Sequence, residues 1–309
     1  MFTLAHLSDP HVGPLPRPRP LELASKRATG FLTWTFRRQA VHSERVLRTL
    51  AADLQQAAPD HIVVTGDIIN IALPGEYTQA ATWLRSLGSP DRVSVIPGNH
   101  DAYVPMPWER SIGLWADFMT GSASNDARRE SPARSDADFP FVRRRGPLAI
   151  VGVSTACPMP PFHACGRAGQ RQLDALRARL VELESDGMFR VVLIHHPPFE
   201  ARGRRRDRLV DSAAFRAVIA EVGAELVLHG HTHRAGLGKL PTPSGAVPVI
   251  GVPSASAKVD HHGKGHGQYH LYCIERDGNR WRVNVEVRGV VPTLERFVPE
   301  GRFLLAVPQ

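Results

Sequence analysis

The sequence predicts an α/β fold, because short apolar runs alternate with amphipathic helices over the first third of the chain. The runs expected to be buried strands are Thr3–Ser8, His61–Thr65 and Val93–Ile96. The helices between them are expected at Ser43–Ala57, where apolar residues recur at helical spacing, and at Glu76–Leu87, which a glycine ends. Strands joined by helices usually pair in parallel, and such sheets place ligands at the carboxyl ends of their strands.

The rest of the chain continues this alternation and ends in strands. Further helices are expected at Trp108–Met119, Gln170–Leu183 and Ser212–Val222. Further strands are expected at Phe139–Arg145, Leu148–Ser154, Val191–Ile194 and Glu225–His229, followed by three antiparallel strands at Val247–Val252, Gln268–Glu275 and Arg280–Val287. The polar stretches 121–138 and 202–208 are expected to be loops. We expect one domain over 1–309, with an insertion at about 14–40 and C-terminal strands at about 247–288.

The composition is that of an ordinary globular protein and excludes several classes. Apolar residues make up 42% of the chain and charged residues 22%. No apolar run reaches about 18 residues, so no membrane-spanning helix is expected, and the N-terminus lacks the basic region of a signal peptide. Cys157, Cys165 and Cys273 are too scattered for a disulfide framework. This indicates a reducing compartment, the bacterial cytoplasm.

The positive charge is carried almost entirely by arginine. The net charge is +8, and only four of the 38 basic residues are lysine. Arginine clusters at 17–38, 143–145 and 202–208 suit contacts with a phosphorylated small molecule, an anionic lipid or nucleic acid. A GC-rich genome explains the arginine count equally well. Nucleic acid is the least favoured partner, because no helix-turn-helix or RNA-binding pattern stands out.

Metal-binding side chains follow the predicted strands in five short motifs. In chain order these are Asp9-Pro10-His11, Gly66-Asp67-Ile68-Ile69-Asn70, Gly98-Asn99-His100-Asp101, His195-His196-Pro197-Pro198 and Gly230-His231-Thr232-His233. Asp9 and His11 can hold one ion, and the two oxygens of Asp67 can bridge two. Mixed nitrogen and oxygen ligands suit Mn²⁺, Fe²⁺/Fe³⁺ or Zn²⁺. The pattern predicts two metal ions that share one carboxylate, an arrangement that cleaves phosphate esters.

The order D-x-H, G-D-x-x-N/D, G-N-H-D/E, H-x-P and G-H-x-H resembles that of the calcineurin-like metallophosphoesterases, over roughly residues 3–275. The resemblance implies two mixed β-sheets packed as a sandwich and flanked by helices. His100 matches the family residue that assists the leaving group or stabilises charge, and Asp101 matches the acid that orients it. The implied ligands are Asp9, His11, Asp67 and His233 for the first metal and Asp67, Asn99, His195 and His231 for the second.

The resemblance also implies a function. In this family, water activated by the two ions attacks phosphorus. The N-terminal D-x-H together with H-H-P-P resembles the bacterial cyclic-nucleotide and glycerophosphodiester phosphodiesterases, so phosphodiester hydrolysis is the leading hypothesis. A nuclease, or a binding module without catalysis, is less favoured because the metal ligands and His100 are all present. Asn70 is expected to hydrogen-bond locally, and His196 to lie behind the ligands or contact the substrate.

Two interpretations of the insertion stay open. Residues 21–40 place aromatic and aliphatic side chains beside Arg37 and Arg38. We favour packing of the aromatics on the core or on a second copy of the chain in a homo-oligomer. The alternative is a basic amphipathic segment that lies on an anionic membrane, with a phospholipid or lipid-linked phosphate as substrate and a peripheral location at the inner membrane.

The remaining histidines are expected to be structural; they include His6, His42, His61, His163 and His229. Four more, His261, His262, His266 and His270, lie in or beside the Gly-rich stretch 260–268. A flexible rim loop is the expected role of that stretch, and a third metal site or a substrate gate is the alternative.

Overall fold

The structure is a computed structural model of the whole chain, and it describes residues 1–121, 132–199, 205–258, 265–291 and 296–308. Most of the expected loop at 121–138, part of the arginine run at 202–208, and His261 and His262 lie outside these residues. None of the described helices is long and apolar enough to cross a membrane.

Two mixed six-stranded sheets form the centre of the fold, as the family resemblance implies. The first sheet has the order β12-β11-β10-β1-β2-β3 and the second has the order β4-β5-β6-β7-β9-β8. The first sheet consists of β1 (Phe2–Leu7), β2 (His61–Val64), β3 (Val93–Val95), β10 (Gln268–Asp277), β11 (Arg280–Val291) and β12 (Arg296–Leu305). The second consists of β4 (Phe141–Arg145), β5 (Leu148–Gly152), β6 (Phe189–Leu193), β7 (Leu226–His229), β8 (Gly236–Thr242) and β9 (Gly245–Gly251).

Each sheet contains a parallel block, and the block contains the strands that precede the sequence motifs. β1, β2 and β3 pair in parallel in the first sheet. β5, β6, β7 and β9 do so in the second. Parallel neighbours end at the same edge of a sheet, so the loops that follow them lie together. The remaining pairings, such as β1 with β10 and β4 with β5, are antiparallel.

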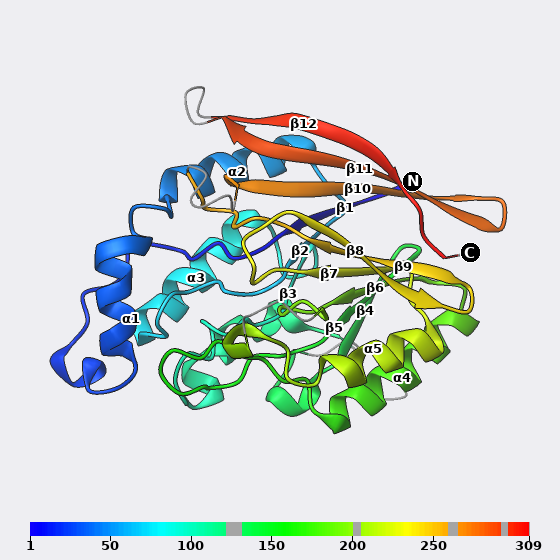
Figure 1. Cartoon of the computed structure of the whole chain (residues 1–309). Helices are drawn as coiled ribbons and strands as arrows, with labels where there is room; N and C mark the ends of the chain where they lie inside the picture. The colour runs from blue at the N-terminus through cyan, green and yellow to red at the C-terminus, as the bar shows by residue number, and fades with distance from the viewer. Residues whose placement is uncertain (122–131, 200–204, 259–264, 292–295, 309) are drawn as a thin grey trace.

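The two sheets face each other, and the core between them is apolar (Figure 1). Because side chains alternate across a strand, β6 contributes Val191 and Leu193 to this core and Val192 to the opposite face. That opposite face is covered by α4 (Gln170–Ser185) and α5 (Ser212–Val222), whose leucine and phenylalanine side chains complete a second apolar cluster. The second sheet is therefore buried on both faces.

The helices beside the first sheet, α2 (Glu44–Ala57) and α3 (Pro74–Leu87), begin at identifiable caps. The Ser43 side chain accepts a hydrogen bond from the backbone N–H of Val46. α3 begins with Pro74, and the buried carboxylate of Glu76 in its first turn accepts the backbone N–H groups of Asn70 and Ile71, at 2.7 and 3.1 Å. This contact ties the loop that carries Asp67 to the helix.

Two expectations about the fold were wrong, and two strands were missed. Trp108–Met119 forms two 3₁₀ segments, Trp108–Arg110 and Ile112–Met119, and not an α-helix. The chain bends at Ser111, and Gly113 packs so tightly on Trp108 that a Cβ there would lie 2.5 Å from its carbonyl oxygen.

The strand at Val247–Val252 was expected in an antiparallel group with β10 and β11. Instead β9 lies in the other sheet and pairs in parallel with β7. β8 and β12 were not predicted at all. Their Gly and Pro residues weaken the local strand pattern, and their long antiparallel pairing with β9 and β11 compensates for it.

The segment 14–40 consists of short helical turns: Pro20–Leu23, then α1 (Arg27–Thr33), then a π-helical turn at Trp34–Arg38. Gly30 contacts Ile71 and Tyr103, so α1 packs on the loops that follow β2 and β3. Trp34 is buried, which agrees with the favoured interpretation. Phe36 is 79% exposed, so it does not pack on the core, and packing on a second copy of the chain stays a prediction. The extent of the domain and the status of this segment as an insertion stay predictions.

A buried histidine on β2 gives the fold a specific sensitivity to acid. His61 lies against Ser94, with 2.8 Å between its Nε2 and the serine Oγ. Burial, assisted by the nearby Arg143 guanidinium, lowers the pKa of His61 to about 2. Its ordinary pKa in an unfolded chain is about 6.5. Between these values the unfolded chain binds a proton that the folded chain does not, so stability falls as the pH falls below about 6.5.

We therefore expect His61 to cost the wild type about 2 kcal/mol of unfolding free energy between pH 7 and pH 5. His61→Gln retains a group that can bond Ser94 but removes this loss. Urea unfolding of both proteins at the two pH values, in chelator, measures it. Equal pH dependence in the two proteins would contradict the argument.

Candidate metal centre

The predicted ligands converge at the carboxyl ends of strands from both sheets. Those of the first sheet are Asp9 and His11 after β1, Asp67 after β2 and Asn99 after β3. Those of the second sheet are His195 after β6 and His231 and His233 after β7. Side-chain atoms of Asp9, His11, Asp67 and His233 lie within 4.8 Å of one another. The structure thus brings together residues that are more than two hundred positions apart in the chain.

Backbone hydrogen bonds join the ligand loops to one another. The N–H of Asp9 donates to Gly66 O at 3.0 Å, and the N–H of His11 donates to Asp67 O at 3.1 Å. Between the sheets, the N–H of His231 donates to Asp9 Oδ2 at 3.0 Å. The positions of the ligands are therefore set by the ends of the strands and not by free loops.

Three of the histidines are oriented by backbone carbonyl groups. His11 Nδ1 lies 3.1 Å from Ile69 O, His195 Nδ1 lies 2.6 Å from Thr65 O, and His231 Nε2 lies 2.8 Å from Asp207 O. A carbonyl can only accept, so each of these nitrogens carries a proton, and the other nitrogen of each ring faces the centre. Burial lowers the pKa of His11 and His231, so this nitrogen presents a lone pair, whereas at His195 the charge of Asp67 outweighs burial and raises the pKa to about 9. Histidines that bind metals are commonly oriented in this way.

The lone pairs and the carboxylates face each other across very short distances. His11 Nε2 is 3.2 Å from His233 Nε2, and His233 Nε2 is 3.1 Å from Asp9 Oδ1. Asp9 Oδ1 is buried, and although His233 is close it has no well-aligned hydrogen-bond donor. Acceptors crowded together without enough protons to share repel one another unless cations lie between them. The residues present therefore fit metal ions.

A second group of possible metal ligands lies beside the first, and Asp67 is close to both groups. Asn99 Oδ1 lies 3.2 Å from His195 Nε2 and 2.9 Å from His231 Nδ1. His195 Nε2 lies 3.4 Å from Asp67 Oδ2. Asp67 is thus close to both groups of donors, which is where a bridging carboxylate would have to be.

The electrostatics keep the two carboxylates charged although they are buried. Burial acts to raise the pKa of Asp67, but the surrounding histidines, His195 and His100 foremost, outweigh it and hold the pKa well below its ordinary value. At Asp9 burial acts in the same direction, and His233 likewise outweighs it and lowers the pKa. Ionised, poorly solvated oxygen ligands are what a divalent cation requires.

The backbone at the ligands adopts an uncommon conformation. Eight described residues other than glycine have positive φ, and five of them are predicted ligands: Asp9, His11, Asp67, His231 and His233, with φ between 43° and 68°. Such conformations carry strain and persist where the surrounding structure enforces them. They turn each side chain away from its strand and toward the common centre.

Glycine is required where two of the loops approach most closely. A Cβ on Gly98 would lie 2.3 Å from Asp67 Oδ1 and 2.5 Å from Asp67 N. Gly66 has φ 93°, and a Cβ there would lie 2.6 Å from Gly98 N. These backbone atoms cannot move aside independently of the ligands.

The residues after Asn99 have different partners from those expected. His100 Nδ1 donates to Asn70 O, and its ring lies edge-on to His11 at 5.1 Å. Asp101 was expected to orient His100. Its carboxylate instead accepts the backbone N–H groups of Ile68, Ile69 and Gly98, at 2.8, 3.1 and 2.8 Å, and so holds two ligand loops together. Asn70 was expected to hydrogen-bond locally, but its side chain donates to Val12 O at 3.0 Å, in the loop that follows β1.

His196 lies behind the ligands. Its Nδ1 accepts from Thr155 Oγ1 at 2.7 Å, and its Nε2 donates to Ala164 O at 3.0 Å. With both nitrogens bonded to protein, His196 packs on the ring of His231, with 4.4 Å between the centroids.

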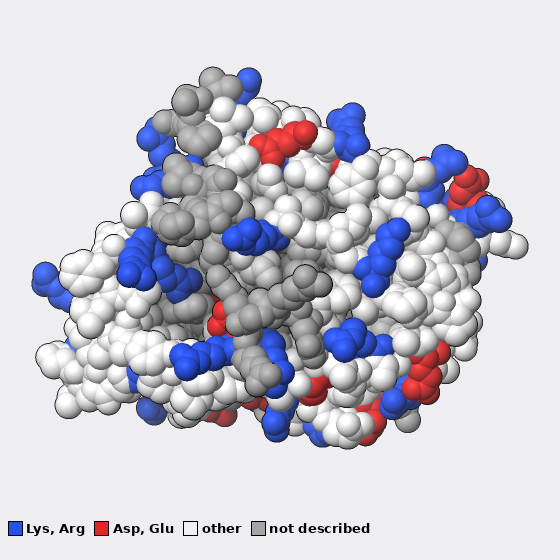
Figure 2. All heavy atoms as spheres, viewed as in Figure 1, with Lys and Arg blue, Asp and Glu red and all other residues white. Residues whose placement is uncertain are grey.

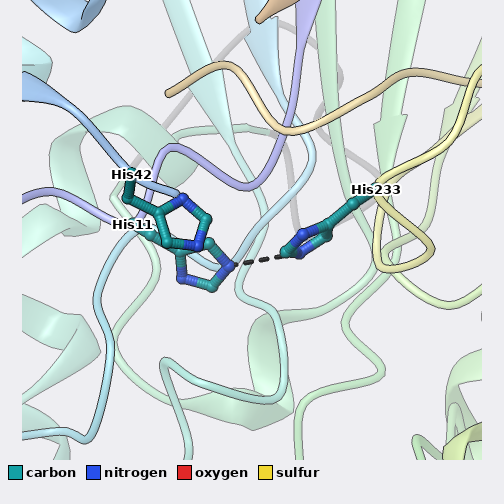
Figure 3. A group of neighbouring side chains, drawn as sticks. All are labelled: His11, His42 and His233. Atoms are coloured by element: carbon teal, nitrogen blue, oxygen red, sulfur yellow. Dashed lines mark hydrogen bonds between the residues drawn. The ribbon is translucent and has the colours of Figure 1, made fainter. Parts of the chain in front are cut away.

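Two residues that sequence reasoning did not assign to the site lie at its edge, and both come from the segment around 14–42. His42 forms a group with His11 and His233, which approach from the ends of β1 and β7 (Figure 3). The His42 ring lies 4.6 Å from that of His11. Arg38 reaches His11 and His100 with its guanidinium. No local pattern signals either residue, because both depend on how α1 and the π-helical turn pack.

Comparison with known proteins agrees with this fold and site. Residues 2–235 match the family described as calcineurin-like phosphoesterase, and the chain belongs to that family. It is therefore a metal-dependent phosphoesterase by family, with His and Asp groups that form a dimetal site typical of it.

Individual relatives are distant. The chain is 27% identical over 236 residues to a protein from Synechococcus sp. named "probable cyclic nucleotide phosphodiesterase", covering 75% of this chain and 78% of the relative. The structure of the present chain is similar to that of a dimetal phosphatase from Danio rerio, with a TM-score of 0.56, 14% identity and coverage of 96% of this chain and 98% of that one. It is also similar to the sulfate thiohydrolase SoxB from Thermus thermophilus, with a TM-score of 0.50, 14% identity and coverage of 96% of this chain and 58% of that one. These two structures support the fold alone.

The contact between Gly98 and Asp67 gives a test of the centre. We expect Gly98→Ala to weaken Mn²⁺ binding roughly 10- to 100-fold, because the added Cβ must displace Asp67. Gly236→Ala is the control, since nothing lies within 4 Å of a Cβ there. Titration calorimetry and metal analysis measure both. Equal affinity and stoichiometry in the two variants would show that Asp67 does not need its present position.

Proposed function

We propose that this protein hydrolyses phosphodiester bonds with two divalent metal ions, on a cyclic-nucleotide or glycerophosphodiester type of substrate. Asp9, His11, Asp67 and His233 would hold the first ion, and Asp67, Asn99, His195 and His231 the second. The observation that carries the proposal is the position of Asp67 between two sets of lone-pair donors. When bound, two such ions lower the pKa of a shared water and neutralise charge on the phosphate oxygens.

The other side chains at the centre would position the substrate and the ligands. His100 lies beside His11, and we assign it to the leaving oxygen or to the charge that develops there. The three N–H bonds of Asp101 hold the loops that carry Asp67 and Asn99 at a fixed separation. His196 fixes the ring plane of His231 from behind.

A cavity beside the centre has room for an organic group attached to the phosphate. It has a volume of about 520 Å³, of the size that holds small organic ligands. Its lining includes His11 from the centre, Phe31, Trp34 and His42 from the segment before α2, and Arg45 and Arg48 from α2 itself. The lining is mixed, because apolar Phe31 and Trp34 lie with basic Arg45 and Arg48 and acidic Glu44, and this suits an organic group with apolar and polar parts, such as a nucleoside. Lys and Arg side chains are also spread over the face of the molecule shown in Figure 2.

The experiment that tests the function is a substrate panel with Mn²⁺-reconstituted protein. We expect turnover of bis(p-nitrophenyl) phosphate and of at least one cyclic nucleotide or glycerophosphodiester, in preference to monoesters and single-stranded DNA. Asp67→Ala should lose metal and activity together, because both sets of donors include this carboxylate. Protein that binds two metal ions and hydrolyses no diester would refute the proposal.

His100→Gln is the matched control for metal binding. It should retain both metal ions while kcat falls roughly 10²-fold or more. An unchanged kcat in this variant would remove the role assigned to His100 and leave the metal centre itself unaffected.

A second candidate function, phosphate ester hydrolysis at a membrane surface, is favoured by the exposed apolar residues of segment 14–40. Leu32 and Phe36 are one helical turn apart and are 55% and 79% exposed, and Leu21 is 89% exposed. The exposed Arg37 adjoins them. Apolar side chains flanked by basic ones bind anionic bilayers, and the substrate would then be a phospholipid or a lipid-linked phosphate. A peripheral location at the inner membrane, like the homo-oligomer, stays a prediction.

Vesicle co-sedimentation tests this candidate. With phosphatidylglycerol-containing vesicles, the wild type should sediment, and Leu32→Ser combined with Phe36→Ser should remain in solution. Leu304→Ser on β12, which removes a side chain that is 67% exposed, is the control and should sediment. Wild-type protein that stays in solution rules the membrane out.

A further inference from the structure

Arg38 enters the metal centre from outside the five motifs. Its Nη1 lies 3.0 Å from His100 Nε2, and its Nη2 lies 2.8 Å from His11 Nε2. The other nitrogens of these two rings donate to Asn70 O and Ile69 O, so each Nε2 presents a lone pair that Arg38 can bond. The two terminal nitrogens of one guanidinium therefore donate in parallel to two acceptors.

The turn that carries Arg38 is firmly held. The backbone N–H groups of Val41 and His42 donate to Arg38 O at 2.9 and 3.1 Å. Trp34, at the start of the same turn, is buried and stacks on His42 with an interplanar angle of 5°. His42 in turn bonds Ser256 Oγ at 2.7 Å. The guanidinium thus comes from a fixed element and is pre-organised toward the centre.

The present partner of Nη2 is incompatible with the proposed metal site. His11 Nε2 has one lone pair, and it cannot serve an arginine N–H and a metal ion together. When the first ion binds, Nη2 must find another acceptor within reach. A phosphate at the centre presents two oxygens at the spacing that the two ends of a guanidinium match.

We propose that Arg38 is a phosphate-binding residue of this enzyme, exchanging its bonds to His11 and His100 for two non-bridging phosphate oxygens when metal and substrate bind. The inference rests on the function proposed above. Burial lowers the pKa of Arg38, and the carboxylates of Asp67 and Asp9 act against this and favour its charge. The 14–40 segment would thus supply, through Arg38, a contact with the phosphate oxygens that no residue of the five motifs is assigned to make.

The test measures inorganic phosphate binding to Mn²⁺-loaded protein by calorimetry, alongside steady-state kinetics with bis(p-nitrophenyl) phosphate. Arg38→Ala should retain two Mn²⁺ and weaken phosphate binding about 10- to 100-fold, as expected for a lost charged hydrogen-bond pair. KM should rise with it. Arg38→Lys, which keeps the charge but not the fork, should recover only part of the affinity. Arg85→Ala removes an exposed arginine on α3 and should stay within twofold of wild type.

The outcomes separate this inference from the function on which it rests. Phosphate affinity within twofold of wild type in metal-loaded Arg38→Ala overturns it, and so does wild-type protein that binds Mn²⁺ but no phosphate. If Arg38→Ala binds Mn²⁺ more tightly and binds phosphate with unchanged affinity, Arg38 only competes with Mn²⁺ for His11, and the inference is overturned. Failure of the wild type to cleave any diester refutes the proposed function, while the binding measurement still decides the role of Arg38. If Arg38→Ala does not fold, Arg38→Gln replaces it.

Discussion

The structure depends on one electrostatic constraint: buried lone pairs and carboxylates converge on a small volume without the protons that would let them bond one another. His11 and His233 face each other nitrogen to nitrogen at 3.2 Å, and carboxylate oxygens of Asp9 and Asp67 lie within 4.8 Å of these rings. Backbone carbonyl groups hold a proton on Nδ1 of His11 and of His195, so these two rings cannot change tautomer without losing those bonds. Divalent cations resolve the conflict, and this explains why a dimetal chemistry suits the site.

The fold creates this volume by ending parallel strands of two sheets at one place. Hydrogen bonds between the loops, such as Asp9 N to Gly66 O, set the spacing of the ligands. The left-handed backbone at Asp9, His11, Asp67, His231 and His233 turns their side chains inward. These strained residues lie in loops that follow strands of the two buried sheets, which hold them in position. Asp101, which bonds three backbone N–H groups, belongs to this framework and not to the reacting groups.

The segment before α2 adds side chains to the centre that the five motifs do not supply. It places Arg38 on the ligands, His42 at their edge and Trp34 in the wall of the adjacent cavity. Its inner face packs through Gly30 on the loops after β2 and β3, and its outer face leaves Phe36 in solvent. The same short segment thus contributes side chains both to the centre and to the surface. A substrate contact and a membrane contact, if both proposals hold, would therefore come from one segment.

The sequence by itself predicted the class of the fold and the family, and it named candidate ligands that the structure brings together, because polar motifs follow the ends of the predicted strands. It could not determine that β8 and β12 are strands, since Gly and Pro weaken their local pattern and only pairing with β9 and β11 stabilises them. It assigned Asp101 to His100, whereas the close packing of two loops directs this carboxylate to backbone N–H groups. It also missed Arg38 and His42. Their role depends on the position of a helical turn relative to residues far away in the chain, and no local spacing encodes such a contact.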